Sequence, residues 1–174
     1  MSQRAWVMGV LLGLFVQDVD NPTYKSWTKF KAGSSVTLTA TNDTGGMKSE
    51  ALIVYTLKSC DGKEAVVTMT GNTTVNGAKT EMPASDARHA AKAKKVAAAK
   101  DAPKPQEGDE EIEVAGKKLK CHWVKTVTET GGYKTTKTVW WSDAIPGGMA
   151  KSESTTEGKM KMSSILVVTA FEKK

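Results

Sequence analysis

A chain of 174 residues, of which 39% are hydrophobic and 25% charged, has the length of one folded domain and the composition of an ordinary globular protein, which excludes wholesale disorder. The formal net charge of +6 comes almost entirely from lysine, since Arg4 and Arg88 are the only arginines among 25 basic residues. Arginine forms bidentate hydrogen bonds with phosphates and with the edge of guanine, so its near absence argues against specific nucleic-acid recognition.

The first 16 residues have the pattern of a secretory signal. Arg4 precedes an apolar run from Ala5 to Val16, which is too short to span a bilayer as a helix and fits the apolar core of a signal peptide. The residues before Gln17 lack a small-x-small cleavage site, which leaves an uncleaved anchor or a buried segment as the alternative. We expect residues 1–16 to be a signal peptide, 17–174 to be one β-rich domain in the periplasm or outside the cell, and the mature form to have no transmembrane span.

A short aromatic helix is predicted directly after this segment. Asn21 is a typical N-cap residue, Pro22 suits the first helical turn, and Gly33 is a stop signal. Three aromatic residues recur at intervals of three and therefore share one face, which we expect to dock on a sheet. They are Tyr24, Trp27 and Phe30.

From Ser35 the apolar period changes to two, which is typical of β-strands. Asp61-Gly62 and Asn76-Gly77 are hairpin signals between such strands, and together they predict an antiparallel meander. The strand pattern resumes at Glu111 and continues through glycine-containing turns to Phe171. We expect about six to nine strands with one helix in front, which is a mainly β (α+β) architecture.

Residues 83–108 depart from the strand pattern. Alanine and lysine favour a helix, and Ser85 or Asp86 suits its N-cap, but its apolar face would consist of alanine and a single valine. We therefore expect a mobile or surface helix that is inserted between strands and runs into a linker around Pro103 and Pro105.

The chain has two cysteines, Cys60 and Cys121. An even pair in an exported protein favours one disulfide, which would close a long loop and contribute about 3 to 4 kcal/mol. Two buried thiols are the alternative. The two cysteines and two histidines have no metal-ligand spacing, so no metal site is predicted.

Catalytic motifs are not apparent. Cys121 and His122 are neighbours in a predicted strand and face opposite sides, which excludes them as a nucleophile and base pair, whereas a pairing of Cys60 with His122 stays open. Ser26 and Lys29 form an S-x-x-K pair, but the other motifs of penicillin-recognising enzymes are missing, and no nucleotide-binding fingerprint is present. We therefore expect a protein that is not an enzyme and uses no cofactor.

Two tryptophans stand side by side in a predicted strand, where neighbours point to opposite faces. Trp141 is in register with Val139, and Trp123 shares a face with Leu119, so Trp123 and Trp141 are predicted to lie in the core. Trp140 shares its face with threonines. It therefore needs cover from the front helix, from the Ala/Lys insertion or from a partner.

The segment TVWWSDAIPGGMAKSES, at about residues 139–154, resembles a recurring segment of uncharacterised exported bacterial proteins, in which a strand ending in Trp runs through a Pro-Gly-Gly turn into the next strand. The order of an aromatic front helix and one long antiparallel sheet with a helical insertion also resembles the half-barrel of the bacterial lipoprotein-localisation carriers. This resemblance implies a large curved antiparallel sheet, or half-barrel meander, around a hydrophobic cavity that accepts acyl chains.

Two functions from different classes follow. The first is an exported, non-enzymatic carrier or binder of lipid or another apolar ligand. The second is a structural or protein-interaction module with a filled core, which would use the lysine-rich face and Trp140. The candidate ligand-binding residues of the first are Trp27, Phe30, Trp123, Trp140, Trp141, Met160 and Met162.

Overall fold

The computed structural model describes residues 18–94 and 103–174, and this part of the chain is mainly β, as predicted. One short helix accompanies the strands. The elements are β1 (Asp18–Asp20), α1 (Pro22–Trp27), β2 (Ser35–Thr44), β3 (Met47–Cys60), β4 (Glu64–Val75), β5 (Ala78–Ala90), β6 (Lys92–Lys94), β7 (Gln106–Val114), β8 (Lys117–Thr130), β9 (Tyr133–Trp141), β10 (Met149–Glu157) and β11 (Met162–Glu172).

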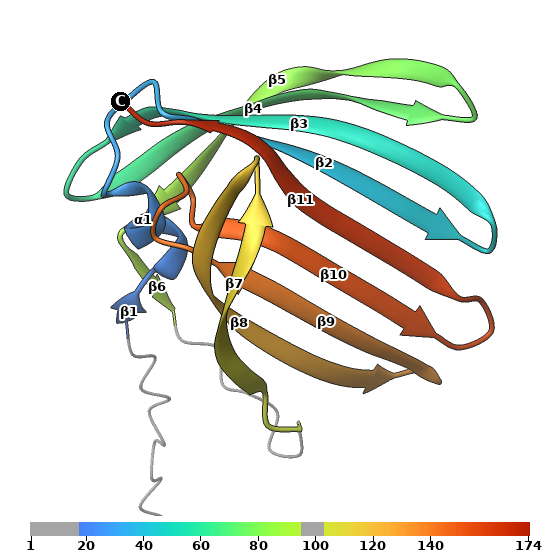
Figure 1. Cartoon of the computed structure of the whole chain (residues 1–174). Coiled ribbons are helices and arrows are strands. Elements are labelled where there is room, and N and C mark those ends of the chain that lie inside the picture. The colour runs from blue at the N-terminus through green and yellow to red at the C-terminus, as the bar shows by residue number, and fades with distance from the viewer. Residues whose placement is uncertain (1–17, 95–102) are drawn as a thin grey trace, which may run out of the picture.

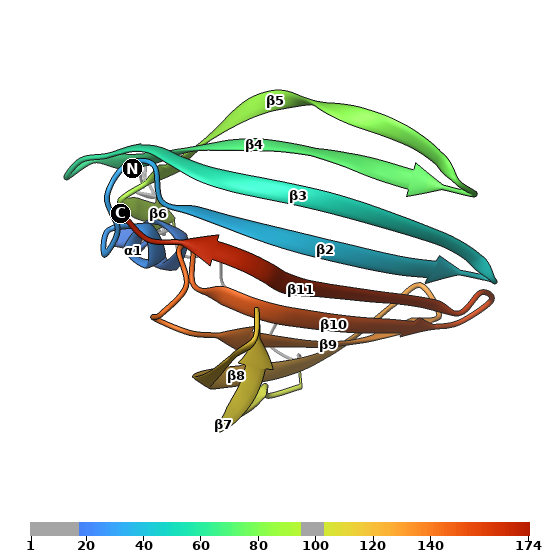
Figure 2. The ribbon, with the colours of Figure 1, turned by 45° about the horizontal axis from the view of Figure 1, so that its top comes forward.

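Nine strands form one antiparallel sheet in the order β5-β4-β3-β2-β11-β10-β9-β8-β7, and β1 pairs with β6 in a small second sheet. Every neighbouring pair in the large sheet is a hairpin except β2 and β11, which bring the two ends of the meander together. The sheet is strongly curved and open, with β5 and β7 at its two edges (Figures 1 and 2). The predicted curved antiparallel meander is confirmed.

Tight turns at the predicted glycine positions join these strands. Asn76 and Gly77 connect β4 to β5 with φ angles of 50° and 81°, which is the backbone that a two-residue hairpin turn requires. Because such a turn sets which residues lie opposite each other, it also sets which side chains share a face of the sheet.

The predicted front helix is α1, and it is shorter than its sequence pattern indicates. Asn21 is its N-cap, with the side-chain Oδ1 accepting from the Thr23 amide at 3.0 Å. The helix ends at Trp27, which is 4% exposed and packs into the core. Phe30 lies beyond the helix and packs partly buried against the same core. Figure 1 shows α1 under one end of the curved sheet, beside the small β1–β6 sheet.

The core lies where α1 and the loop between β9 and β10 cover that end of the sheet. Leu38, Leu57 and Ile145 are at most 1% exposed there. At the opposite end, near the β2–β3 and β10–β11 turns, no residue in 41–51 or 153–164 is buried. Apolar burial, the main source of folding stability, is therefore concentrated at the helix end.

The expected helix at the start of the 83–108 insertion is wrong, because residues 83–90 belong to the edge strand β5. Pairing with β4 overrides the helix propensity of this segment. Asp86 accepts a 2.7 Å hydrogen bond from the Thr68 hydroxyl, and Arg88 forms a 2.5 Å ion pair with Glu64, so polar side chains satisfy one face of the strand. Residues 95–102 of the insertion lie outside the described residues, and β7 begins at Gln106.

The predicted disulfide does not form, because Cys60 and Cys121 are both free thiols. Cys60 ends β3 and Cys121 lies in β8, and four strands separate β3 from β8 in the sheet. Burial raises the pKa of both thiols. The alternative of two buried thiols is correct for Cys121, whereas Cys60 is half-buried. The same separation keeps Cys60 away from His122.

The N-terminal apolar run lies outside the described residues, so export stays a prediction. Within 18–94 and 103–174, no helix has the length and apolar character that crossing a membrane requires.

Candidate functional site

A small apolar cavity lies between α1 and the inner face of the sheet. We use "apolar cavity" for this space of about 230 Å³. Three aromatic side chains from three different elements contribute to its wall: Trp27 from α1, Tyr55 from β3 and Trp141 from β9. The full lining is Thr23, Trp27, Val36, Leu38, Tyr55, Val67, His89, Trp141, Pro146, Gly147 and Met149.

Strand register explains why these side chains meet. Val36 in β2 lies opposite Tyr55 in β3, and residues directly opposite each other in an antiparallel pair share a face. Leu38 is on the same face as Val36, two positions along, which is the apolar period that the sequence shows. Val67 in β4 lies opposite Leu57, which extends this inner face to a third strand.

The prediction that Trp141 lies in the core is wrong, since its side chain is 42% exposed at the wall of the cavity. Trp123, which is predicted to lie in the core as well, is only half-buried. Trp123 lies opposite Trp140, while Trp141 lies opposite His122. Trp123 and Trp140 therefore occupy the other face of the sheet.

Trp140 is covered by its own chain. Its Nε1 donates to a carboxylate oxygen of Glu110, and the Nζ of Lys151 lies 5.0 Å from its ring centroid. Trp123 packs beside it over Gly108, where an added Cβ would lie 2.9 Å from the indole. The two tryptophans thus form a half-buried pair that β7 shields.

Met160 and Met162 lie at the far end of the sheet. Met160 is in the turn between β10 and β11 and is 50% exposed, and a Cβ added at Gly45 would lie 3.4 Å from its side chain. Met162 begins β11 opposite Thr44. The structure therefore brings together Trp27 and Trp141 among the seven candidate residues, places Phe30 in the core beside them, and keeps the other four away from the apolar cavity.

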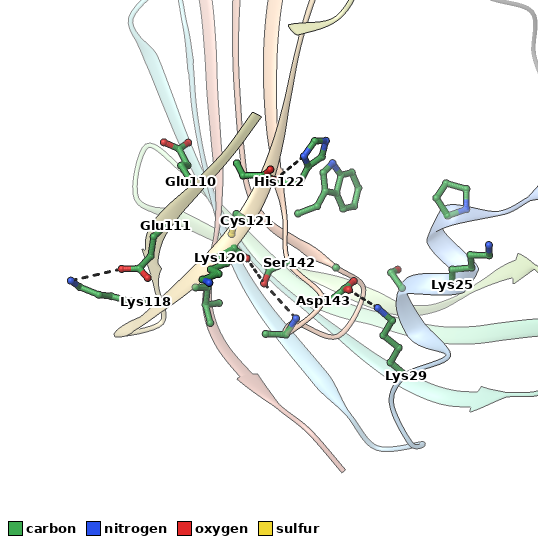
Figure 3. Close-up of a pocket in the computed structure, with 17 residues that line it drawn as sticks. Lys25, Lys29, Glu110, Glu111, Lys118, Lys120, Cys121, His122, Ser142 and Asp143 are labelled. Carbon is green, nitrogen blue, oxygen red and sulfur yellow. Dashed lines mark hydrogen bonds and ion pairs between the residues drawn. The ribbon is translucent and has the colours of Figure 1, made fainter. Parts of the chain in front are cut away.

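A larger polar cleft adjoins the apolar cavity. It encloses about 1220 Å³ between α1, β7, β8 and the start of the β9–β10 loop (Figure 3). Lys29 forms an ion pair with Asp143 at 2.7 Å, and His122 Nδ1 is within hydrogen-bonding distance of Asp109 Oδ1, at 3.1 Å. We use "polar cleft" for this space. Its other charged lining residues are Lys25, Lys118, Lys120, Glu110 and Glu111.

Helix α1 and Trp141 separate the two spaces. Thr23 and Trp27 line the apolar cavity, whereas Lys25 and Ser26 line the polar cleft, so one helix contributes to both walls. Trp141 lines both spaces. Trp141 is therefore a wall that the cavity and the cleft share.

The Pro-Gly-Gly turn at residues 146–148, between β9 and β10, packs directly against α1. Gly147 has φ of +79°, and a Cβ added there would lie 2.8 Å from Cζ2 of Trp27. Gly148 also has φ of +79°, and a Cβ there would lie 3.0 Å from Cβ of Ser26. Both positions need glycine for the backbone conformation and for the close approach of the helix.

Polar contacts outside the cavity anchor α1. The backbone N–H of Asn21 donates to the Ala91 carbonyl at 3.0 Å, and the Tyr24 hydroxyl donates to the Asp61 carbonyl. Lys25 lies 2.6 Å from Asp20, which also pairs with Lys92 of β6. Hydrogen bonds from these two ammonium groups lower the pKa of Asp20 to about 2.

Sequence reasoning missed part of the cavity wall. Tyr55 and Val67 follow the alternating pattern of their strands, which contains the signal for an inner face. His89 was not predicted to line the cavity because its segment, which forms β5, has the composition of a helix. Pro146 and Gly147 were interpreted only as turn residues, and Met149 only as part of the strand that follows the turn.

Comparison with known proteins does not extend this description, because the chain matches no protein family, no curated protein and no solved structure.

Proposed function

We propose that this protein binds a small apolar ligand in the apolar cavity under α1. One observation supports the proposal: a space of about 230 Å³ lies under α1 against core residues that are almost completely buried. Aromatic and aliphatic side chains dominate its wall, which is the usual character of a small-molecule site. Burying an apolar ligand there would remove apolar surface of both partners from water.

The volume limits what the cavity encloses. Sites for drug-sized molecules measure about 300 to 1,000 Å³, so about 230 Å³ suits the compact apolar part of a ligand. The remainder of a larger molecule would extend past Trp141 into the polar cleft. An extended acyl chain, which the carrier resemblance implies, fits inside only if α1 moves outward.

The second candidate function, a protein-interaction module, has support on the outer face of the sheet. Leu52 is 40% exposed and Ile165 is 46% exposed. They lie opposite Thr39 and Thr41 of β2, which are two positions apart and so share one face. This face does not contribute to the apolar cavity, so the two functions are separable by mutation.

A cavity-blocking variant tests the ligand proposal. Thr23→Trp would place an indole at the exposed part of the cavity wall, and Thr28→Trp adds the same group just beyond α1, at a position that does not line the cavity. We expect the full chain and Thr28→Trp to bind N-phenyl-1-naphthylamine equally, and Thr23→Trp to bind it at least about tenfold more weakly. Probe fluorescence measures all three affinities. Equal binding by both variants, or none by the unaltered protein, would refute the proposal.

A further inference from the structure

His89 adds a polar group to the wall of the apolar cavity. It lies in β5 opposite Ala65, which is fully buried, so the histidine is on the inner face of the sheet. Its neighbours in sequence, Arg88 and Ala90, point to the other face by strand alternation. The imidazole thus lies on the same wall as Tyr55 and Val67.

The hydrogen-bonding capacity of this imidazole is unused within the part of the chain that the structure describes. Its ring nitrogens have no hydrogen-bond partner among residues 18–94 and 103–174, and the same holds for the Tyr55 hydroxyl. Burial lowers the pKa of His89, which keeps its ring neutral at pH 7. A neutral imidazole offers one donor and one acceptor.

Formal charges are absent from the cavity wall as described, since no Lys, Arg, Asp or Glu side chain lines it. The charged residues nearest to His89 along β5 are occupied on the outer face, where Asp86 pairs with Lys58 at 2.9 Å and Arg88 pairs with Glu64 at 2.5 Å. A carboxylate or an ammonium group placed in the cavity would lose its hydration without gaining an opposite charge. The enclosed part of the ligand is therefore uncharged.

We propose that the apolar cavity selects a compact, ring-shaped molecule that carries one uncharged hydroxyl or carbonyl group, and that this group hydrogen-bonds to His89. The proposal rests on the proposed function and names its ligand class. The ring shape follows from the flat aromatic walls formed by Trp27, Tyr55 and Trp141 and from the volume of about 230 Å³.

Matched ligands test the proposal on the full chain. Naphthalene, 2-naphthol and 2-naphthoate share one ring system and differ only in the polar group. We expect 2-naphthol to displace N-phenyl-1-naphthylamine at roughly two- to tenfold lower concentration than naphthalene, which corresponds to one net hydrogen bond. We expect 2-naphthoate to be the weakest of the three competitors, because its carboxylate would be desolvated without a partner.

Substitution by leucine at two positions of β5 tests whether His89 forms the hydrogen bond with 2-naphthol. In His89→Leu the advantage of 2-naphthol over naphthalene should disappear while naphthalene still binds. In Arg88→Leu, the matched control on the outer face, the advantage should persist. If the advantage survives His89→Leu and is lost in Tyr55→Phe, the bond goes to Tyr55 and the assignment to His89 is wrong.

A direct measurement covers the case in which His89→Leu does not fold. At saturation of each ligand, the ¹⁵N chemical shifts of the His89 ring in the unaltered protein should move farther with 2-naphthol, which forms a hydrogen bond, than with naphthalene, which does not. Equal affinity of naphthalene and 2-naphthol, or equal ring shifts with both, overturns the ligand class but leaves the proposed function standing. Failure of every naphthalene derivative to bind overturns both.

Discussion

The two ends of the large sheet differ in what covers them. At the helix end, α1 and the β9–β10 loop lie over the inner face, and Leu38, Leu57 and Ile145 are almost completely buried. At the turn end, the same strands continue as a single layer, and no residue in 41–51 or 153–164 is buried. The comparison teaches that long strands need not be packed along their whole length, because cross-strand pairing extends a sheet from a packed base.

Side-chain type follows this difference. The turn end is rich in threonine, whose branched side chain suits a half-exposed pleated surface. Thr135 of β9 and Thr156 of β10 share a 2.9 Å hydrogen bond across two strands there. The helix end instead contains the aromatic residues Trp27 and Tyr55, and the apolar cavity lies at its margin. Function and stability are thus expected to reside in the same half of the sheet.

Truncation of one apolar side chain at each end tests this comparison most directly. Leu38→Ala removes a side chain that is 1% exposed at the helix end, and we expect a loss of about 2 to 5 kcal/mol in the free energy of unfolding. Met47→Ala, on a side chain that is 61% exposed at the turn end, should cost at most about 0.5 kcal/mol. Urea denaturation of both variants measures the difference. Similar losses would mean that the turn end is also packed in solution.

Alanine at two turn glycines gives the next largest effect. Gly147→Ala strains a backbone at φ of +79° and pushes against Trp27, so we expect a loss of about 1 to 3 kcal/mol and weaker probe binding. Gly131→Ala has φ of +59° and nothing within 4 Å of the added Cβ, so backbone strain of about 1 kcal/mol is its whole cost. Thermal unfolding and probe titration report the two effects. Unchanged probe binding in Gly147→Ala would show that α1 is not seated on this turn.

The smallest effect is the pH dependence of the Asp20 ion pairs. Since the pKa of Asp20 falls from 3.8 to about 2 on folding, its contribution to stability is present above pH 4 and is lost as the pH falls toward 2. Asp20→Asn should therefore be less stable than the unaltered protein at pH 6 and equally stable near pH 1.5. Glu81→Gln, on an exposed pair with Lys79 near the turn end, should show no such difference. Denaturation at both pH values decides between these outcomes.

Most of the fold was predictable because its signals are local. Alternating apolar residues and glycine turns indicate the strands of β2–β4 and β8–β11 within a few residues of where they form. The register at Trp140 and Trp141 was predictable too, because a two-residue turn at Gly131-Gly132 places Trp123 opposite Trp140. The sequence pattern does not indicate that β7 covers Trp140 on the outer face, or that Trp141 lies at the exposed margin of the inner face.

The candidate site depends on contacts between distant segments, and this limits its prediction. His89 reaches the cavity because β4 pairs with a segment of helical composition, so tertiary pairing overrode local propensity. The free cysteines follow from a separation of four strands in a sheet order that no local pattern shows. Trp27 was identified from its helical spacing because Asn21 and Pro22 mark the start of α1 locally.

The indole N–H signals of the tryptophans test the central claim most directly. In a ¹H–¹⁵N correlation spectrum of the full chain, assigned by single Trp→Phe variants, naphthalene should shift the signals of Trp27 and Trp141 and leave those of Trp123 and Trp140 in place. That result would locate an apolar ligand in the cavity under α1. Shifts confined to Trp123 and Trp140, or no shifts at ligand saturation, would contradict a binding site on the inner face of the sheet.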